Sequence, residues 1–157
     1  MALSSEVLDL AAKLIEMNGL CKRVYTQSFK AVTPGVGTTT TIKQHCTIGA
    51  VIDILNGLDD PSNIRPDNRH TWVNSGDYAV LAIDTMNGYM LKAIIPVTSN
   101  FPSDEAREYE DSSFLGTIEQ YRIHRAIADW NDVEERTMAE VVAALRIAAQ
   151  LAREDGN

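Results

Sequence analysis

Apolar residues recur at intervals of three and four positions along four segments of the chain, which is the spacing of one face of a helix. The first segment follows a pair of serines that can cap a helix, and it ends at Asn18-Gly19, a left-handed stop signal. The last segment follows Thr137 and Glu140, which have the spacing of a capping box. We therefore predict helices over residues 4–18, 46–57, 117–130 and 138–153. The apolar face of the first would consist of Leu3, Val7, Leu10, Ala11, Leu14 and Ile15, and that of the last of Val141, Val142, Leu145, Ala148, Ala149 and Ala152.

Other segments lack this spacing. Residues 22–45 are rich in Thr, Gly and β-branched side chains and predict a loop, or a short hairpin around Pro34-Gly35. Residues 77–97 fit a helix or a hairpin, and their Ala, Leu and Met content without strict alternation favours the helix. Residues 98–116 predict a mobile acidic loop. The predicted fold is mainly α: a single domain over residues 1–157, a compact bundle of about four helices with a Thr/Gly-rich loop and a possible small β-hairpin.

Composition limits where the protein works. The apolar runs are too short to span a membrane, and the N-terminus is an amphipathic, carboxylate-bearing segment unlike a signal peptide. Two cysteines, Cys21 and Cys46, do not make a disulfide framework. We therefore predict a cytoplasmic protein with reduced thiols and no membrane partner.

The net charge of -8 argues against a nucleic-acid partner, because phosphate binding needs clustered cations. The charge is uneven, however, because no Asp or Glu occurs between Met17 and Ile52. That stretch carries Lys22, Arg23, Lys30 and Lys43. These cations predict either an anion site, completed by exposed amides at the helix start near Cys46, or internal pairing with the acidic segment 104–111.

Polar residues crowd in front of the last predicted helix, where Trp130-Asn131-Asp132 is followed by Arg136-Thr137. In a structural interpretation, Asn131 and Asp132 form a turn over a buried Trp130, and Arg136 binds a carboxylate or backbone carbonyls. The alternative is that these residues belong to a binding site.

The same segment carries a resemblance. Its pattern WND-x3-RT-x2-EV resembles the C-terminal signature of an uncharacterised domain family of actinobacteria and their bacteriophages, known only as a domain of unknown function. MNGLCKRVY (residues 17–25) and HCTIGAV (residues 45–51) are similar to two other segments of that family, although Leu20 and His45 stand where the family tends to have Trp. Residues 63–116 match none of its motifs. The resemblance implies a mostly helical fold and a phage or actinobacterial source, and it implies no activity. If the protein is phage-encoded, we expect it in the host cytoplasm.

Catalytic chemistry has one candidate nucleophile, Cys46, at a predicted helix N-terminus. A base could come from His45, His70 or His124, with Asn131 or Asp132 to orient it. The apolar residues after Cys46 favour a buried structural thiol instead, so we assign no catalytic residue. Cysteine and histidine lack short paired spacings, and the stretch TPGVGTTTTIK lacks the phosphate-loop spacing, so neither a metal nor a cofactor is predicted.

Three functions follow as hypotheses. The first is a non-enzymatic phage or actinobacterial accessory protein that binds a host protein, in host takeover or counter-defence. The second is a binder that sequesters an anionic small molecule such as a signalling nucleotide, and the third is a cysteine hydrolase using Cys46. A homodimer is compatible with each. The candidate ligand-binding residues are Lys22, Arg23, Lys43, His45, Asn131, Asp132 and Arg136.

Overall fold

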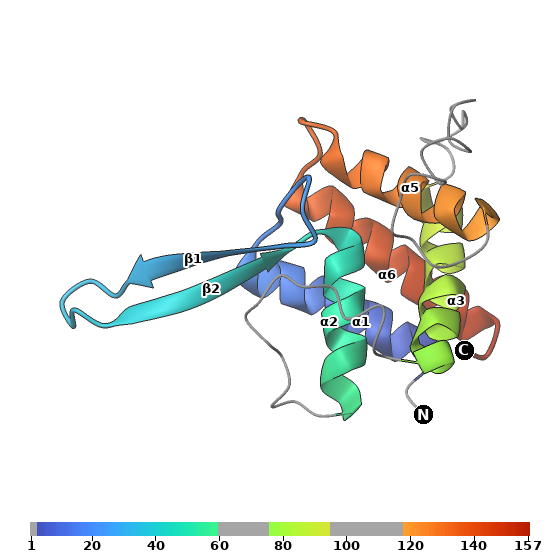
Figure 1. Cartoon of the computed structure of the whole chain (residues 1–157), viewed down its shortest axis with the longest axis horizontal. Helices are drawn as coiled ribbons and strands as arrows, with labels where there is room; N and C mark the ends of the chain where they lie inside the picture. The colour runs from blue at the N-terminus through green and yellow to red at the C-terminus, as the bar shows by residue number, and fades with distance from the viewer. Residues whose placement is uncertain (1–2, 60–75, 95–117) are drawn as a thin grey trace.

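Helices dominate the computed structural model, which describes residues 3–59, 76–94 and 118–157. Within these ranges the chain forms five helices and one antiparallel hairpin, and Figure 1 shows their arrangement. The elements are α1 (Ser4–Asn18), β1 (Thr26–Val32), β2 (Thr39–His45), α2 (Thr47–Asp59), α3 (Gly76–Ile94), α5 (Ile118–Asp132) and α6 (Met138–Glu154). The mainly α prediction is confirmed, but the count of about four helices was too low. The fifth is α3, where the helix prevails over the hairpin.

The antiparallel pair α1 and α6 forms the centre of the core. Small side chains let the two helices approach closely, since Ala11 and Ala12 of α1 and Ala148 and Ala149 of α6 are all fully buried. Exposed ion pairs flank this contact, Glu16 with Arg146 at 2.8 Å and Asp9 with Arg153. The apolar face predicted for the last helix is buried throughout.

The starts of these two helices differ in their caps. In α6 the predicted capping box is present: Glu140 N donates to Thr137 Oγ1 at 3.2 Å, and Thr137 N donates to Glu140 Oε2 at 2.8 Å. In α1 the prediction of a serine cap was wrong, because Leu3 is the capping residue and its amide donates to Glu6 Oε2 at 3.2 Å. The stop at Gly19 is confirmed by its positive φ of 98°.

The buried face of α1 also differs from the predicted one. Leu8 and Ala12 are fully buried, whereas Leu3 and Leu10 are 49% and 38% exposed. The reason is that α1 packs against α2 as well as α6, so two adjacent stripes of the helix are covered instead of one.

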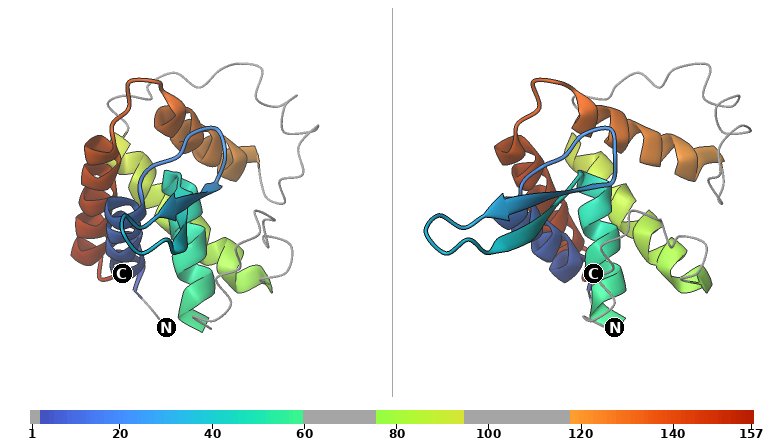
Figure 2. Two further views of the ribbon diagram at one scale, coloured as in Figure 1. Left: turned by 90° about the vertical axis from the view of Figure 1, so that its left-hand side faces the viewer. Right: turned by 60° about the vertical axis from the view of Figure 1, so that its left-hand side comes forward.

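The remaining helices surround this pair. α3 packs against α6 and α5, while α2 packs against α1 and α5, as the views in Figure 2 show. α2 begins one residue later than predicted and runs two residues further, to Asp59. Its first turn lies close to the chain before β1, because a Cβ on Gly49 would come 2.1 Å from the Tyr25 carbonyl oxygen.

The hairpin is the part of the described chain that leaves the helical body (Figures 1 and 2). β1 and β2 pair from Thr26↔His45 at the base to Val32↔Thr39 at the tip, and residues 32–41 are all exposed. The sequence predicted a loop or a short hairpin here, and the strands are seven residues long each. We refer to residues 26–45 as the arm.

None of the described helices is both long and apolar enough to cross a membrane. The predicted acidic loop at residues 98–116, its acidic segment 104–111 and His70 lie outside the described residues.

Candidate functional site

The end of α5 is joined to the start of α2 by one buried amide side chain. Asn131 is 1% exposed, and its Oδ1 accepts hydrogen bonds from Thr47 N at 2.9 Å and Thr47 Oγ1 at 2.5 Å. Its Nδ2 donates to the Cys21 carbonyl oxygen at 3.2 Å. Asn131 thus connects three segments that are far apart in the sequence.

Asp132 fixes the loop that follows α1. Its Oδ1 accepts hydrogen bonds from Arg23 N at 2.8 Å and from Asn131 Nδ2 at 3.1 Å. Arg23 has a φ of 68°, a left-handed conformation that is unfavourable for any residue with a Cβ. The bond to Asp132 helps to hold this strained position and leaves the Arg23 side chain exposed.

Two cations bind backbone carbonyls at the end of α5. Lys22 Nζ donates to the carbonyl oxygens of Val133 and Glu134, both at 2.6 Å. Arg136 Nε donates to the Trp130 carbonyl oxygen at 3.0 Å, and its guanidinium stacks 4.2 Å from the centre of the buried Trp130 ring. Positive charge is favourable at a helix C-terminus, where carbonyls lack partners. The structural interpretation of Trp130 and Arg136 is therefore supported.

The start of α2 does not offer the exposed amides that we predicted for an anion. The Thr47 amide bonds to Asn131, and the Gly49 amide donates to Cys46 Sγ at 3.3 Å. Residues 45–52 are also buried. Cys46 therefore acts as the cap of this helix.

Both thiols are free, buried and poorly suited to nucleophilic attack. Burial raises the pKa of Cys46 to about 12, although the Gly49 amide lowers it in part. Burial likewise raises the pKa of Cys21 to about 11, and the charge of Asp132 adds to the rise. A reactive cysteine needs a thiolate near neutral pH, so these values favour a structural role.

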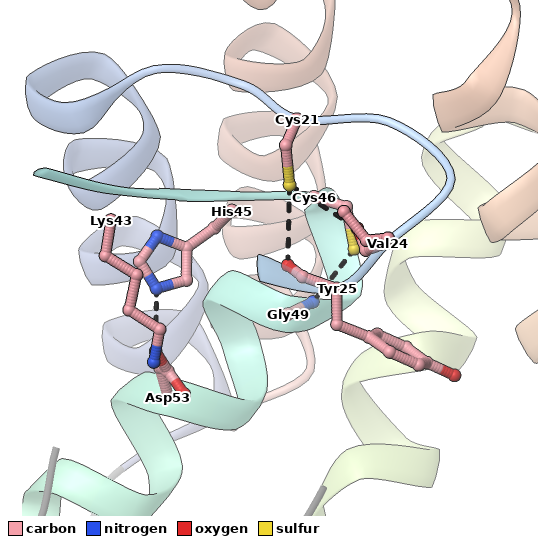
Figure 3. A network of polar contacts seen from close by, with 8 residues as sticks. All are labelled: Cys21, Val24, Tyr25, Lys43, His45, Cys46, Gly49 and Asp53. Carbon is pink, nitrogen blue, oxygen red and sulfur yellow. Dashed lines mark hydrogen bonds and ion pairs between the residues drawn. The ribbon is translucent and has the colours of Figure 1, made fainter. Parts of the chain in front are cut away.

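A second cluster lies at the base of the arm, where two basic side chains share one carboxylate oxygen (Figure 3). Lys43 Nζ and His45 Nε2 each lie 2.7 Å from Asp53 Oδ2 on α2. Burial alone would raise the pKa of Asp53, but the hydrogen bonds from His45 and Lys43 outweigh it, and the pKa lies below its ordinary value. His45 Nε2 must carry a proton to bond the carboxylate, and its ring points away from Cys46.

The structure thus divides the predicted binding residues into two groups. Five lie around the end of α5, namely Lys22, Arg23, Asn131, Asp132 and Arg136. The other two, Lys43 and His45, lie at the base of the arm on Asp53. Among the described residues, no three His, Cys, Asp or Glu side chains are placed to share a metal ion.

Sequence reasoning missed two partners of these residues, Asp53 and Thr47, and one further polar contact. Asp53 could have been found, because it is the first carboxylate after the acid-free stretch and lies two helical turns from Cys46. Thr47 carries no comparable signal. The contact of Tyr25 Oη with His124 Nε2 at 2.6 Å has no sequence signal either. Burial raises the pKa of this phenol to about 12.

Comparison with known proteins shows where the chain belongs. A model of a family of unknown function, DUF6197, matches residues 2–151. The chain is a member of DUF6197. No curated protein and no solved structure matched it. The match to DUF6197 runs through residues 63–116, so the family covers the middle of the chain, which the three sequence motifs do not reach.

Three segments of the sequence carry the resemblance to the family, and they meet in space. The segment 17–25 supplies Cys21 and Lys22, the segment 45–51 supplies Thr47, and the C-terminal segment supplies Asn131. They hold one another through hydrogen bonds at the end of α5. In this member of DUF6197 these residues therefore fix the base from which the arm projects.

Proposed function

We propose that the protein is a non-enzymatic binding protein that engages a protein partner through the arm. One observation supports this most: the arm leaves the helical body and carries exposed apolar side chains. Phe29, Val32 and Val36 are 43%, 66% and 68% exposed. Large apolar side chains that gather on one projecting element are typical of a protein-binding surface.

The side chains with catalytic potential support a non-enzymatic role. The Cys46 thiol serves as a helix cap, and the nearest histidine in sequence, His45, faces Asp53. A cysteine hydrolase would need a thiol and a base within hydrogen-bond reach of each other. Among the described residues, no such contact joins Cys46 to a histidine.

The anionic-ligand alternative has weaker support. Lys43 is 2.7 Å from Asp53, and Lys22 and Arg136 donate to carbonyl oxygens, so three of the predicted cations already have internal partners. We include in the proposal a phage or actinobacterial source, as the resemblance implies, and a host protein as the partner.

A photo-crosslinking amino acid at Val36 tests the proposal in extracts of the host. The matched control carries the same group at Ile147, an apolar residue of α6 that is 52% exposed and does not belong to the arm. We expect a protein product that depends on position 36. The purified product is then titrated by calorimetry against the native chain and against a triple variant, Phe29→Thr, Val32→Thr and Val36→Thr, which keeps β propensity. The proposal fails if position 147 gives the same products, or if the triple variant binds as tightly as the native chain.

A further inference from the structure

Cys21 and Cys46 lie side by side where the chain after α1 meets the end of β2. His45 N donates to Gly19 O at 3.3 Å, and Cys21 N donates to His45 O at 3.1 Å. These two bonds form a parallel bridge between Leu20 and His45. Each cysteine is the next residue on its own segment, so the two occupy adjacent positions beyond the bridge. Neighbouring extended segments lie about 4.8 Å apart, and a disulfide needs Cα atoms about 4.4–6.8 Å apart.

The Tyr25 carbonyl oxygen brings the two cysteines together a second time. It accepts a hydrogen bond from Cys46 N at 2.9 Å and another from Cys21 Sγ at 3.7 Å, so the thiol and the amide meet at one atom. Figure 3 shows the Cys21 side chain pointing from the loop toward the start of α2, where Cys46 lies. Burial raises the pKa of Cys46, and the nearby Cys21 sulfur raises it further. The two thiols are therefore close neighbours in the fold.

A bond between these two sulfur atoms would enclose the whole arm. Residues 26–45 lie between the cysteines, so the closed loop would begin in the chain after α1 and end at the start of α2. Both of its ends are buried, since Cys21 is 3% and Cys46 is 8% exposed. A cross-link stabilises mainly by restricting the unfolded chain, and the effect grows with the length of the loop. A disulfide here would hold the base of the arm to the helical body.

We propose that Cys21 and Cys46 are a redox-active pair, which a small disulfide such as glutathione disulfide converts to an intramolecular disulfide. Cys21 attacks first, because its pKa of about 11 is lower than the pKa of Cys46, about 12. Its thiolate attacks one sulfur of the small disulfide, whose S–S bond breaks and releases one small thiolate. The Cys46 thiolate then attacks Cys21 Sγ in the mixed disulfide, and the second small thiolate leaves. The two protein thiols lose two electrons to the small disulfide, and their two protons go to the two leaving thiolates.

Burial determines how this pair responds. The raised pKa values leave few thiolates near neutral pH, so exchange is slow, and the measure of the pair is the position of its equilibrium. Reducing surroundings keep the two buried thiols, whereas an excess of small disulfide links them. The pair is therefore a redox-dependent lock at the base of the arm.

The first test measures the equilibrium between the thiol pair and the disulfide in buffers with graded ratios of glutathione to glutathione disulfide. The purified chain is equilibrated in buffer alone and in urea that unfolds it, then quenched with acid, and the two forms are separated by chromatography. We expect the equilibrium constant for disulfide formation to be about 100-fold larger for the folded chain, because folding holds the cysteines together. An equal or smaller constant for the folded chain overturns the proposal.

The matched control moves one thiol by a single residue. Cys21→Ser with Lys22→Cys leaves the loop through the arm almost as long, so disulfide formation in the unfolded chain stays nearly the same. In the folded chain the Lys22 side chain reaches the carbonyl oxygens of Val133 and Glu134 instead of the Tyr25 carbonyl oxygen. We expect folding to give this variant no gain in the equilibrium constant. The same 100-fold gain in the variant would overturn the assignment of Cys21 as the partner of Cys46.

The second test measures the thermal stability of the two forms by calorimetry. We expect the oxidised chain to melt about 5–10 °C above the chain kept reduced, because the disulfide and the native state favour each other to the same extent. A variant with Cys21→Ser and Cys46→Ser should have the same Tm with and without glutathione disulfide. An oxidised native chain that melts at or below the Tm of the reduced chain overturns the lock. Both tests use the purified chain alone, so their outcome is independent of the proposed protein partner.

Discussion

Asn131 illustrates why one side chain type suits one position. The site presents two donors, from Thr47 N and Thr47 Oγ1, and one acceptor, the Cys21 carbonyl oxygen. At neutral pH only a primary amide offers both an acceptor and a donor in that shape. A carboxylate of the same size keeps the two accepted bonds but loses the donated one. It also brings a buried negative charge against Asp132, whose Oδ1 now lies 3.1 Å from Asn131 Nδ2.

We therefore expect Asn131→Asp to lower the free energy of unfolding at neutral pH by about 2–4 kcal/mol. The loss should shrink at acidic pH, where the protonated carboxyl can again donate to Cys21. Urea denaturation at neutral and at acidic pH measures the unfolding free energy. The control is Gln27→Glu, the same change from amide to carboxylate at an exposed position of the arm, which should lower that free energy little. A loss that does not change with pH would contradict the hydrogen-bond assignment.

The sequence predicted Asn131 and Asp132 either as turn residues or as members of a binding site, and neither prediction named their partners. Local propensity favours Asn and Asp at turns, and it contains no information about Thr47, 84 positions away. The same limit applies to Lys43, whose charge was evident from the sequence while its pairing with Asp53 was not. Side-chain chemistry could be predicted from the sequence, but the partner depends on how helices pack.

Asp53 gives the molecule a defined acid sensitivity. Its pKa is lowered from 3.8 in the folded protein, because the hydrogen bonds from His45 and Lys43 outweigh the effect of burial. A group with a lowered folded pKa contributes stability above its unfolded pKa, and that contribution is lost as the pH falls through the folded value. We expect Asp53→Asn to be less stable than the native chain at neutral pH by about 1–2 kcal/mol, and the difference to narrow below pH about 4. Chemical denaturation at several pH values measures the difference in unfolding free energy between the two proteins. A difference that is constant with pH would contradict a stabilising role of the ionised Asp53.

At the scale of elements, α2 depends on a close approach at its first turn. A Cβ at position 49 would lie 2.1 Å from the Tyr25 carbonyl oxygen, which is backbone and cannot rotate away. We expect Gly49→Ala to cost at least about 2 kcal/mol of unfolding free energy. Gly88→Ala in α3 is the matched control, because within the described part of the chain no atom outside its own helix lies within 4 Å of a Cβ added there, and it should raise stability by about 0.5–1 kcal/mol. Equal effects of the two substitutions would contradict the close approach.

Elements with local signals were the easiest to predict. α6 has both its cap and its apolar spacing in adjacent residues, and its start at Met138 was predicted to the residue. The arm was underestimated because Thr39–Thr41 faces solvent on both sides, so no alternation marks the strand. Its seven-residue strands are defined by pairing with each other, which the period of either strand alone does not reveal.

For the molecule as a whole, the central question is whether the cations of residues 17–52 serve a ligand or the fold. Lys22 binds carbonyls at the end of α5 and Lys43 binds Asp53 at the base of the arm. These contacts share no residue, so their contributions should add. We expect Lys22→Ala with Lys43→Ala to lower stability by about 2 kcal/mol in total, which for a chain of this size lowers the Tm by about 4–8 °C.

The two single variants should each account for about half of that decrease, and Lys30→Ala on the exposed arm should leave the Tm unchanged. Differential scanning calorimetry with and without inorganic phosphate separates the two readings of these cations. If they serve the fold, phosphate leaves the native Tm unchanged and the double variant melts lower with or without it. A phosphate-dependent rise in the native Tm that the double variant lacks would instead support an anion site, because a ligand stabilises only the state that binds it.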